Sequence, residues 1–356
     1  MPARLPWQAR PVEQTRPPID VLVNAVGPWA TVRVDQPFEA LQRRGWDVRL
    51  HPAPFDLNKV IRPHSLVIWQ RPVPEHWDQW RACLQGMRRL GCLLLVEWDD
   101  HPELFPQEVR ERMAICRHAH LQLAHALQCS SPRLAQALRG FHHLPLVVEN
   151  GVEPLPPLNL LKHDPGQRLR VFLGNLNRVE EHRQLLPDLR RWLEEDQHMQ
   201  LVTAGPSGLN GALPMERLDC HPMLSYRSYR QLLASCQVAL LPLHCGVPQA
   251  CKTPIKWMEA AVESTAVVAG PELYAPWVQE GRFGVWAEGP AAVVQEARRL
   301  AYDPERRRQL VHRAHIAAQD HALTAQLSWR EALYCHLWRL RQRLDQVLVA
   351  RWPELQ

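Results

Sequence analysis

Short apolar runs alternate with amphipathic stretches along the chain. Runs of four to eight apolar residues predict buried strands, and apolar positions spaced by three or four residues predict helices. In the first half we expect strands at Asp20–Val26, Trp46–His51, Ser65–Gln70, Cys92–Trp98, Leu127–Ser130 and Leu146–Val148, with helices at Val34–Arg44, Trp77–Leu90, Gln107–His120 and Pro132–Leu138. Apolar strands that alternate with helices predict a parallel sheet covered by helices on both faces.

The same pattern restarts after a Pro-rich, aperiodic stretch that begins at Glu153. Strands are expected at Arg170–Leu173, Gln200–Ala204, Val238–Pro242 and Ala266–Ala269, and helices at Arg183–Glu194, Tyr226–Ser235, Pro254–Val262 and over most of Ala291–Trp352. The predicted fold class is therefore α/β, with two Rossmann-like domains facing each other across a cleft and a C-terminal helical segment. The expected organisation is a disordered Pro/Arg-rich tail (1–18), an N-terminal domain (19–152), a linker (153–167), a C-terminal domain (168–324) and a helix returning to the N-terminal domain (325–356). In such sheets ligands bind at the carboxyl ends of the strands.

Composition narrows the class of protein and of partner. Of the 356 residues, 46% are hydrophobic and 22% charged, as in globular proteins, which excludes a disordered or collagen-like chain. The net charge of +5 favours anionic ligands, but it is too small and too dispersed to indicate nucleic acid, which we do not expect as a partner.

Cysteine usage and the N-terminal residues bear on the compartment. Nine cysteines occur without a CxxC pair, which favours a reducing environment. The first 18 residues lack the apolar core of a secretory signal. We therefore expect a cytoplasmic protein. Peripheral contact with the inner face of the membrane stays open, because Trp77–Leu90 carries Arg81, Arg88 and Arg89 on an amphipathic stretch.

The most informative segment is Ser235–Gly270, which reads as strand, loop, helix, strand. The helix begins near Pro254, shortly after Lys252, and carries Lys256 and Glu259 in its first turns. A helix N-terminus presents unpaired N–H groups and a partial positive charge, so with two lysines it suits a diphosphate, while a carboxylate there suits a ribose diol. The alternative is that Lys256 and Glu259 form a solvated pair on a helix surface.

This segment resembles a known signature. Lys252–Ala261 followed by Ala266–Gly270 is similar to the nucleotide-sugar motif of GT-B glycosyltransferases, in particular the family-four, glycosyl transferases group 1 donor domain. Further similar segments are Val171–Arg178, Tyr229–Leu233 followed by Ala239–Leu243, Tyr274 followed by Val278 and Gly281–Gly284, and Asp303–Arg306. The weaker similarities are Gly27 with Arg33, Leu41 and Gly45, Asp99-Asp100, Ser130–Leu134 and Asn150–Val152. Together they span most of residues 20–320.

The resemblance implies a metal-independent, retaining transfer of a hexosyl or related group from a nucleoside-diphosphate sugar, with UDP or GDP as the nucleotide, to a hydroxyl of a glycan, lipid-linked or protein acceptor. No cofactor is implied besides the donor substrate. The donor-binding residues would be Gly174, Asn175, Arg178, Lys252, Thr253, Lys256 and Glu259, and the acceptor-side loop would include Gly27, Arg33 and His101. Lys256 would also be catalytic, because it stabilises the departing diphosphate.

The chain departs from the family pattern at one chemically important place. The first of the family's two glutamates, which contacts the sugar, falls at Cys251. A catalytically inactive nucleotide- or glycan-binding protein of the same fold is therefore the alternative function.

Two acidic residues end the strand Cys92–Trp98 on the predicted cleft. Asp99 or Asp100 is a candidate catalytic residue, as general base toward the acceptor hydroxyl or as the group that orients it. The alternative is an Asp pair that caps the following helix. The spacing of Glu97 and Asp99 is also similar to that of an acidic motif that binds magnesium. We nevertheless expect no metal, because the lysines and the helix terminus near Pro254 can neutralise a diphosphate.

Overall fold

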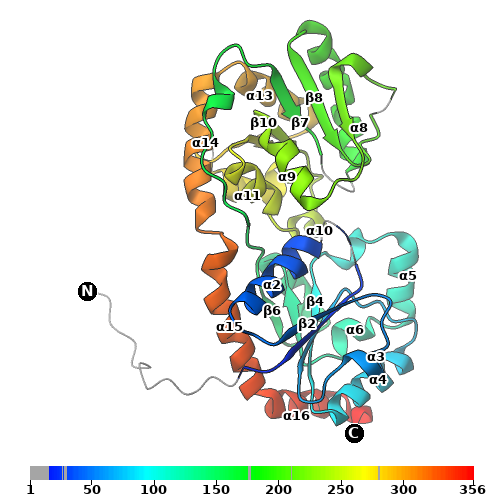
Figure 1. Cartoon of the computed structure of the whole chain (residues 1–356). Helices are drawn as coiled ribbons and strands as arrows, with labels where there is room; N and C mark the ends of the chain where they lie inside the picture. Colours follow the sequence, from blue (N-terminus) through cyan, green and yellow to red (C-terminus); the bar gives the residue numbers. More distant parts are fainter. Residues whose placement is uncertain (1–15, 26, 28–29, 175–177, 210, 280) are drawn as a thin grey trace.

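The computed structural model contains two parallel sheets in two halves that lie end to end (Figure 1). The structure describes residues 16–25, 27, 30–174, 178–209, 211–279 and 281–356. In the described part of the chain each sheet has six strands. The first has the order β2-β1-β3-β4-β5-β6 and the second β12-β11-β10-β7-β8-β9. Both orders require crossovers through helices, as the alternating pattern predicts.

The first sheet is built from β1 (Ile19–Val23), β2 (Val48–Pro52), β3 (Leu66–Gln70), β4 (Leu93–Trp98), β5 (Ala126–Cys129) and β6 (Pro145–Val147). Its helices are a π-helical turn (Thr31–Asp35), α2 (Gln36–Arg43), α3 (Leu57–Val60), α4 (Trp77–Arg89), α5 (Gln107–Ile115), α6 (Ala119–Gln122) and α7 (Pro132–Ala137). Ser131 caps α7 through a hydrogen bond that its hydroxyl accepts from Leu134 N at 3.1 Å. The central strands β3 and β4 are fully buried, because helices cover both faces.

The second sheet is built from β7 (Leu169–Phe172), β8 (Met199–Ala204), β9 (Leu218–His221), β10 (Val238–Leu241), β11 (Ala266–Ala269) and β12 (Val285–Trp286). Its helices are α8 (Val179–Glu195), α9 (Tyr226–Ala234), α10 (Val247–Ala250), α11 (Ile255–Val262), α12 (Pro271–Val278), α13 (Pro290–Ala301) and α14 (Pro304–Gln319). Two of its strands were not expected from the sequence. The edge strand β9 is only partly buried and carries polar residues, and β12 has two residues, so neither produces an apolar run.

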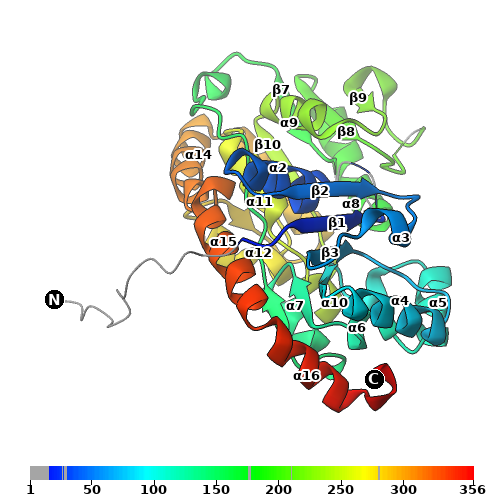
Figure 2. The ribbon, with the colours of Figure 1, turned by 60° about the horizontal axis from the view of Figure 1, so that its bottom comes forward.

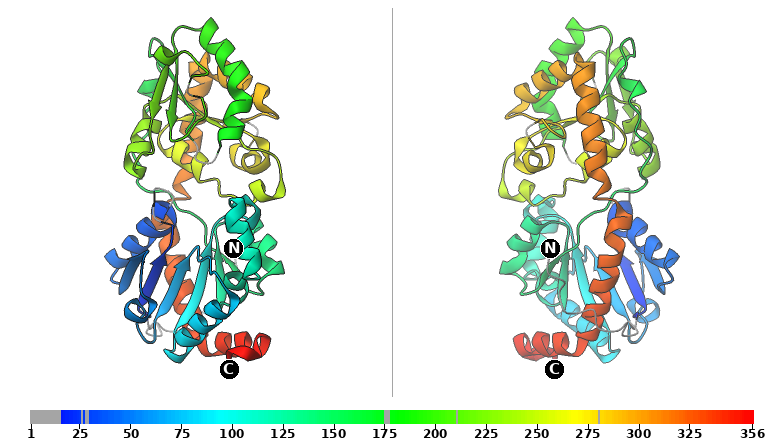
Figure 3. Two further views of the ribbon diagram at one scale, coloured as in Figure 1. Left: turned by 90° about the vertical axis from the view of Figure 1, so that its right-hand side faces the viewer. Right: turned by 90° about the vertical axis from the view of Figure 1, so that its left-hand side faces the viewer.

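The C-terminal helices α15 (Leu323–Arg339) and α16 (Arg341–Arg351) lie against the first sheet, continuing the line of α14 down one side of the molecule (Figure 2). Side views show α15 beside the strands of the first sheet (Figure 3). Its Tyr334 stacks on Phe38 with ring centroids 6.4 Å apart and donates a hydrogen bond to Gln128 Oε1 at 2.9 Å. Helix α15 therefore completes the core of the first sheet. At the other end of the chain, Arg16 contacts the ring of Trp46.

The helix expected over Gln107–His120 is interrupted. It ends at Ile115, and Arg117 and His118 follow with positive φ angles of 50° and 51° before α6 begins. A left-handed backbone at two non-glycine residues ends a right-handed helix, which the apolar spacing alone does not reveal. Within the described residues, no helix is both long and apolar enough to cross a membrane.

Candidate functional site

A cavity of about 570 Å³ opens between the two sheets and is lined by residues from both. Nine of the residues singled out by sequence line it: Arg33, Asp99, Asp100, Gly174, Arg178, Lys252, Thr253, Lys256 and Glu259. Gly27 and His101 do not line it; the ring of His101 instead accepts a hydrogen bond from Glu103 N. Asn175 lies outside the described residues. The fold thus gathers at one place side chains that are up to 226 positions apart in the sequence.

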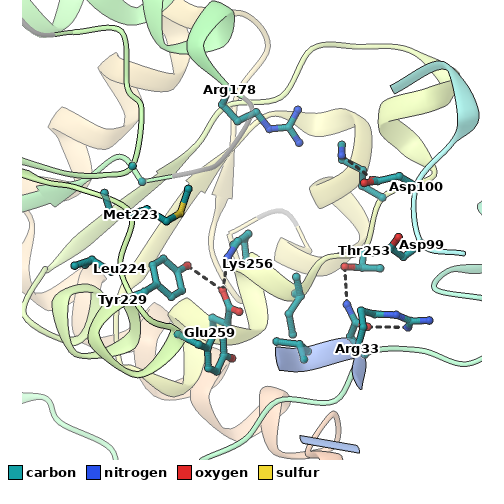
Figure 4. Close-up of a pocket in the computed structure, with 18 of the residues that line it drawn as sticks. Arg33, Asp99, Asp100, Arg178, Met223, Leu224, Tyr229, Thr253, Lys256 and Glu259 are labelled. Atoms are coloured by element: carbon teal, nitrogen blue, oxygen red, sulfur yellow. Dashed lines mark hydrogen bonds and ion pairs between the residues drawn. The ribbon is translucent and has the colours of Figure 1, made fainter. Parts of the chain in front are cut away.

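On the side of the second sheet, Glu259 is the centre of a buried polar cluster (Figure 4). Its side chain is 1% exposed, and its Oε2 accepts from the Lys256 ammonium at 3.0 Å and from the Tyr229 hydroxyl at 2.9 Å. Lys256 also lies over the Tyr229 ring, with Nζ 4.3 Å from the centroid. Burial and the charge of Glu259 raise the pKa of Tyr229, so its hydroxyl stays a donor. The Lys256–Glu259 pair is therefore not a solvated surface pair.

The loop after β7 brings Gly174 and Arg178 to the same cavity. At Gly174 a Cβ would lie 2.2 Å from the Phe172 ring, so the close approach of backbone to ring requires glycine. Arg178 precedes α8 and pairs with Glu181, Nη1 to Oε1, at 2.9 Å. Arg178 therefore lines the cavity beyond the carboxyl end of β7, as the sequence analysis predicts.

On the side of the first sheet, Arg71 holds both candidate acidic residues. Its Nε donates to Asp99 Oδ1, and its Nη2 donates to Asp100 Oδ2 at 2.8 Å. Burial alone would raise the pKa of Asp99, but the charge of Arg71 and its hydrogen bond outweigh burial and hold that pKa below its usual value. Arg71 itself has φ +47°, a strained backbone for a residue with a side chain.

Lys252 connects the two halves of the site. It comes from the loop before α11, and its ammonium lies 2.8 Å from Asp100 Oδ1 across the cavity. The neighbouring Thr253 hydroxyl accepts a hydrogen bond from Asn150 Nδ2 at 3.0 Å. The Cys251 carbonyl accepts one from the Ser131 hydroxyl at 2.6 Å. Three consecutive residues of the second half therefore contact the first.

Arg33 is held deeper in the first half. Its Nε donates to Glu97 Oε1 at 2.7 Å, and its Nη1 donates to Val148 O and to Asn150 Oδ1, both at 2.8 Å. The side chains of Arg33 and Glu97 are 4% and 1% exposed. Arg33 therefore fixes Asn150, which in turn contacts Thr253.

The position of the missing family glutamate faces away from the cavity. Cys251 is 1% exposed and packs into the hydrophobic core of the first half. Burial raises the pKa of its thiol, so the side chain is a neutral core residue.

Several cavity residues were not among the site residues that the sequence analysis named, and three of them make the contacts described above: Arg71, Asn150 and Tyr229. Arg71 and Asn150 follow predicted strands. Asp99 was chosen because it is a polar residue at the end of a strand, and the same criterion would have found these two residues. Tyr229 sits on a helix, where an aromatic residue usually signals core packing, and no sequence signal marks its contact with Glu259.

No group of three or more His, Cys, Asp or Glu side chains arranged to hold a metal ion occurs among the described residues. The acidic motif considered for magnesium is divided between two guanidinium groups, because Glu97 pairs with Arg33 and Asp99 with Arg71. Metal independence remains a prediction.

No protein-family model and no curated protein matches this sequence. Solved structures match its fold over most of its length. Sucrose-phosphate synthase from Thermosynechococcus elongatus has a TM-score of 0.68 at 15% identity, covering 91% of this chain and 100% of its own. HepE from Anabaena in complex with UDP-glucose has a TM-score of 0.60 at 12% identity, covering 89% and 98%. An alpha-glucosyltransferase in complex with UDP-glucose and DNA has a TM-score of 0.62 at 10% identity, covering 90% and 99%.

These likenesses show that the chain has the GT-B fold, as the sequence resemblance implies. One of the matched proteins is bound to DNA, so the fold itself is compatible with a nucleic-acid partner. The expected absence of such a partner therefore stays a prediction based on charge.

Proposed function

We propose that this protein is a glycosyltransferase that moves a sugar from a nucleoside-diphosphate sugar to an acceptor hydroxyl. The observation that carries the proposal is the convergence of Arg178, Lys252 and Lys256 with the buried Glu259 in one cavity of a GT-B fold. Matched proteins of this fold bind UDP and UDP-glucose, which makes UDP the first nucleotide to test.

The diphosphate would lie at the N-terminus of α11. Lys256 is the second residue of this helix, so its ammonium and the helix terminus act on the same anion. As the bond between the sugar and the diphosphate breaks, negative charge grows on the leaving diphosphate. Fixed cations that stabilise this charge more in the transition state than in the ground state accelerate the reaction. Lys256, Arg178 and Lys252, which all line the cavity, would perform this task.

The nucleoside would occupy the part of the cavity around Glu259. A carboxylate accepts hydrogen bonds from both hydroxyls of a ribose, and the Oε2 contacts with Tyr229 and Lys256 hold this carboxylate in place. Apolar side chains of Met223 and Leu224 line the same region and provide surface for a base.

The acceptor would approach from the first half, where Asp99 and Asp100 line the cavity. Because both carboxylates are bound by Arg71 and the pKa of Asp99 is lowered, we assign them to binding and orienting the acceptor hydroxyl rather than to removing its proton. An inverting displacement calls for such a base, so we propose that the sugar is transferred with retention. The lysines that line the cavity and the start of α11 supply positive charge for the diphosphate, so we also propose that no metal ion is needed.

The test has two stages. Titration calorimetry with UDP, GDP and ADP identifies the nucleotide, and UDP should bind. Incubation with the corresponding nucleotide sugars, followed by NMR, should then show slow release of the sugar. Transfer to an added alcohol such as glycerol should give a glycoside with the anomeric configuration of the donor, because a glycoside, unlike a free sugar, does not interconvert between anomers. Absence of binding to all three nucleotides contradicts the proposal.

A binding protein without catalytic activity is the second candidate, and the observation that favours it is Cys251. The family's sugar-contacting glutamate is replaced there by a side chain packed in the opposite core. Nucleotide binding without hydrolysis or transfer from any tested nucleotide sugar would support this candidate.

A further inference from the structure

Lys252 pairs with Asp100, and the proposed function would bring a second anion to the same ammonium. It is bound to Asp100 Oδ1 at 2.8 Å, and it lines the cavity proposed for the donor diphosphate. We infer that Asp100 is a positioning residue that holds Lys252 until the donor diphosphate takes the ammonium, which frees a carboxylate oxygen of Asp100 for the acceptor. This inference rests on the proposed function.

The geometry around Asp100 allows this exchange without disordering the site. Each of its oxygens has one cationic partner, Lys252 at Oδ1 and Arg71 at Oδ2. Arg71 also binds Asp99, so it keeps both carboxylates in place when Lys252 moves. When Lys252 leaves, Asp100 Oδ1 has no cationic partner and can accept a hydrogen bond from a hydroxyl group of the acceptor.

Lys252 can change partners while its backbone stays in place. The residues on either side are held to the first half, through the Cys251 carbonyl and the Thr253 hydroxyl. A lysine carries its charge on a flexible four-carbon stem, so the ammonium can swing about a fixed Cα. The side chains of Lys252 and Asp100 are 23% and 25% exposed, so the pair is accessible to an incoming anion.

The donor has the advantage in this competition. A diphosphate carries more negative charge than a carboxylate, and Asp100 already shares the charge of Arg71. Because coupling between two binding sites is reciprocal, a donor that frees Asp100 strengthens acceptor binding, and the acceptor strengthens donor binding equally. Donor and acceptor should therefore each bind more tightly in the presence of the other.

The experiment uses UDP and the full chain, with affinities measured by titration calorimetry. Asp100→Asn removes the competitor and should tighten UDP binding by about three- to five-fold, the worth of a partly exposed ion pair. A merely structural role for Asp100 predicts weaker binding instead. Asp99→Asn is the matched control, since it removes one negative charge from the same cavity but from a side chain bound by Arg71 and not by Lys252. It should change the affinity less than two-fold (roughly the effect of a screened charge that does not contact the lysine).

A double-mutant cycle tests whether Asp100 affects UDP binding through Lys252. In a Lys252→Met background, Asp100→Asn should tighten UDP binding no more than Asp99→Asn does. Equal tightening by the two asparagine variants, or an unchanged affinity in Asp100→Asn with a wild-type melting temperature, would overturn the competition and leave the proposed function intact. Failure of the wild type to bind any nucleotide would overturn both.

Discussion

The ammonium of Lys256 lies over the ring of Tyr229, 4.3 Å from its centroid. Both side chains meet Glu259 Oε2, so a cation, an aromatic hydroxyl and a carboxylate form one unit. Lys256 is fixed by its neighbours before any ligand arrives, which reduces the entropy lost on binding.

Lys256→Ala should weaken UDP binding at least tenfold, because a charge-assisted hydrogen bond to phosphate contributes about 1.5–3 kcal/mol. Turnover should fall further, since charge grows on the leaving diphosphate. Calorimetry with UDP measures the first effect and sugar release the second. Lys256→Arg, which keeps the charge, is the control and should retain more affinity. Lys256→Ala leaves the buried Glu259 without its lysine partner, so the melting temperature of each variant shows whether the fold is kept. UDP binding by Lys256→Ala equal to that of the wild type would mean that the diphosphate does not bind at Lys256.

Glu259→Gln tests the ribose assignment. The wild type should prefer UDP over 2′-deoxy-UDP at least tenfold, because one hydrogen bond to a charged group contributes about 1.5–3 kcal/mol. In Glu259→Gln this preference should shrink to a few-fold, because a neutral amide oxygen is a weaker acceptor and an uncharged hydrogen bond contributes about 0.5–1.5 kcal/mol. Competition titrations with the two nucleotides provide the measurement. A preference that survives the substitution would mean that another group contacts the 2′-hydroxyl.

Arg33→Met should destabilise the first half by about 3–5 kcal/mol, because it leaves Glu97 as an unpaired buried charge. Urea unfolding measures this loss. The double variant Arg33→Met/Glu97→Met removes both charges and should recover at least half of it. If the single and double variants were equally unstable, most of the loss would come from the missing contacts of Arg33 with Val148 and Asn150 rather than from the unpaired charge.

Stability should decrease in mild acid because of buried neutral histidines. Burial lowers the pKa of His142 to about 4, and its two ring nitrogens are satisfied by Ala124 O and Leu144 N. The unfolded chain has a histidine pKa of about 6.5, so between these values it binds more protons than the folded chain. The stabilisation of the folded state that comes from neutral His142 is therefore fully present above pH 6.5 and is lost as the pH falls toward 4.

The free energy of unfolding should fall by up to about 1.4 kcal/mol per pH unit for this histidine across that window. Urea unfolding at pH 7, 6 and 5 measures the slope. His142→Gln should flatten it, whereas substitution of the exposed His76 by Gln should not. The same slope in both variants would show that His142 does not titrate in this range.

Sugar release should continue in excess EDTA, because lysines and a helix terminus supply the positive charge. Activity that disappears in EDTA and returns with Mg²⁺ or Mn²⁺ would contradict metal independence. The same assay on Lys256→Ala is informative, since a metal-dependent enzyme would lose less from the loss of one lysine.

Features that arise from neighbours along the chain could be predicted from the sequence. Alternating apolar runs and helical spacing were enough to predict two parallel sheets. The loop, Pro254 and the two lysines were enough to predict a helix start with two lysines beside it at α11, and both lysines line the cavity. Local chemistry produces these signals, so they can be recognised without knowledge of the fold.

Which charges meet depends on the three-dimensional arrangement of the chain. Asp100 and Lys252 are 152 residues apart, Arg33 and Glu97 are 64 apart, and Arg71 reaches its two carboxylates across neighbouring strands. The same arrangement turns Cys251 into the opposite core and buries Glu259 beneath Tyr229. The partner of a charged side chain depends on strand order and on the packing of one domain against the other, and no pattern of nearby residues encodes either.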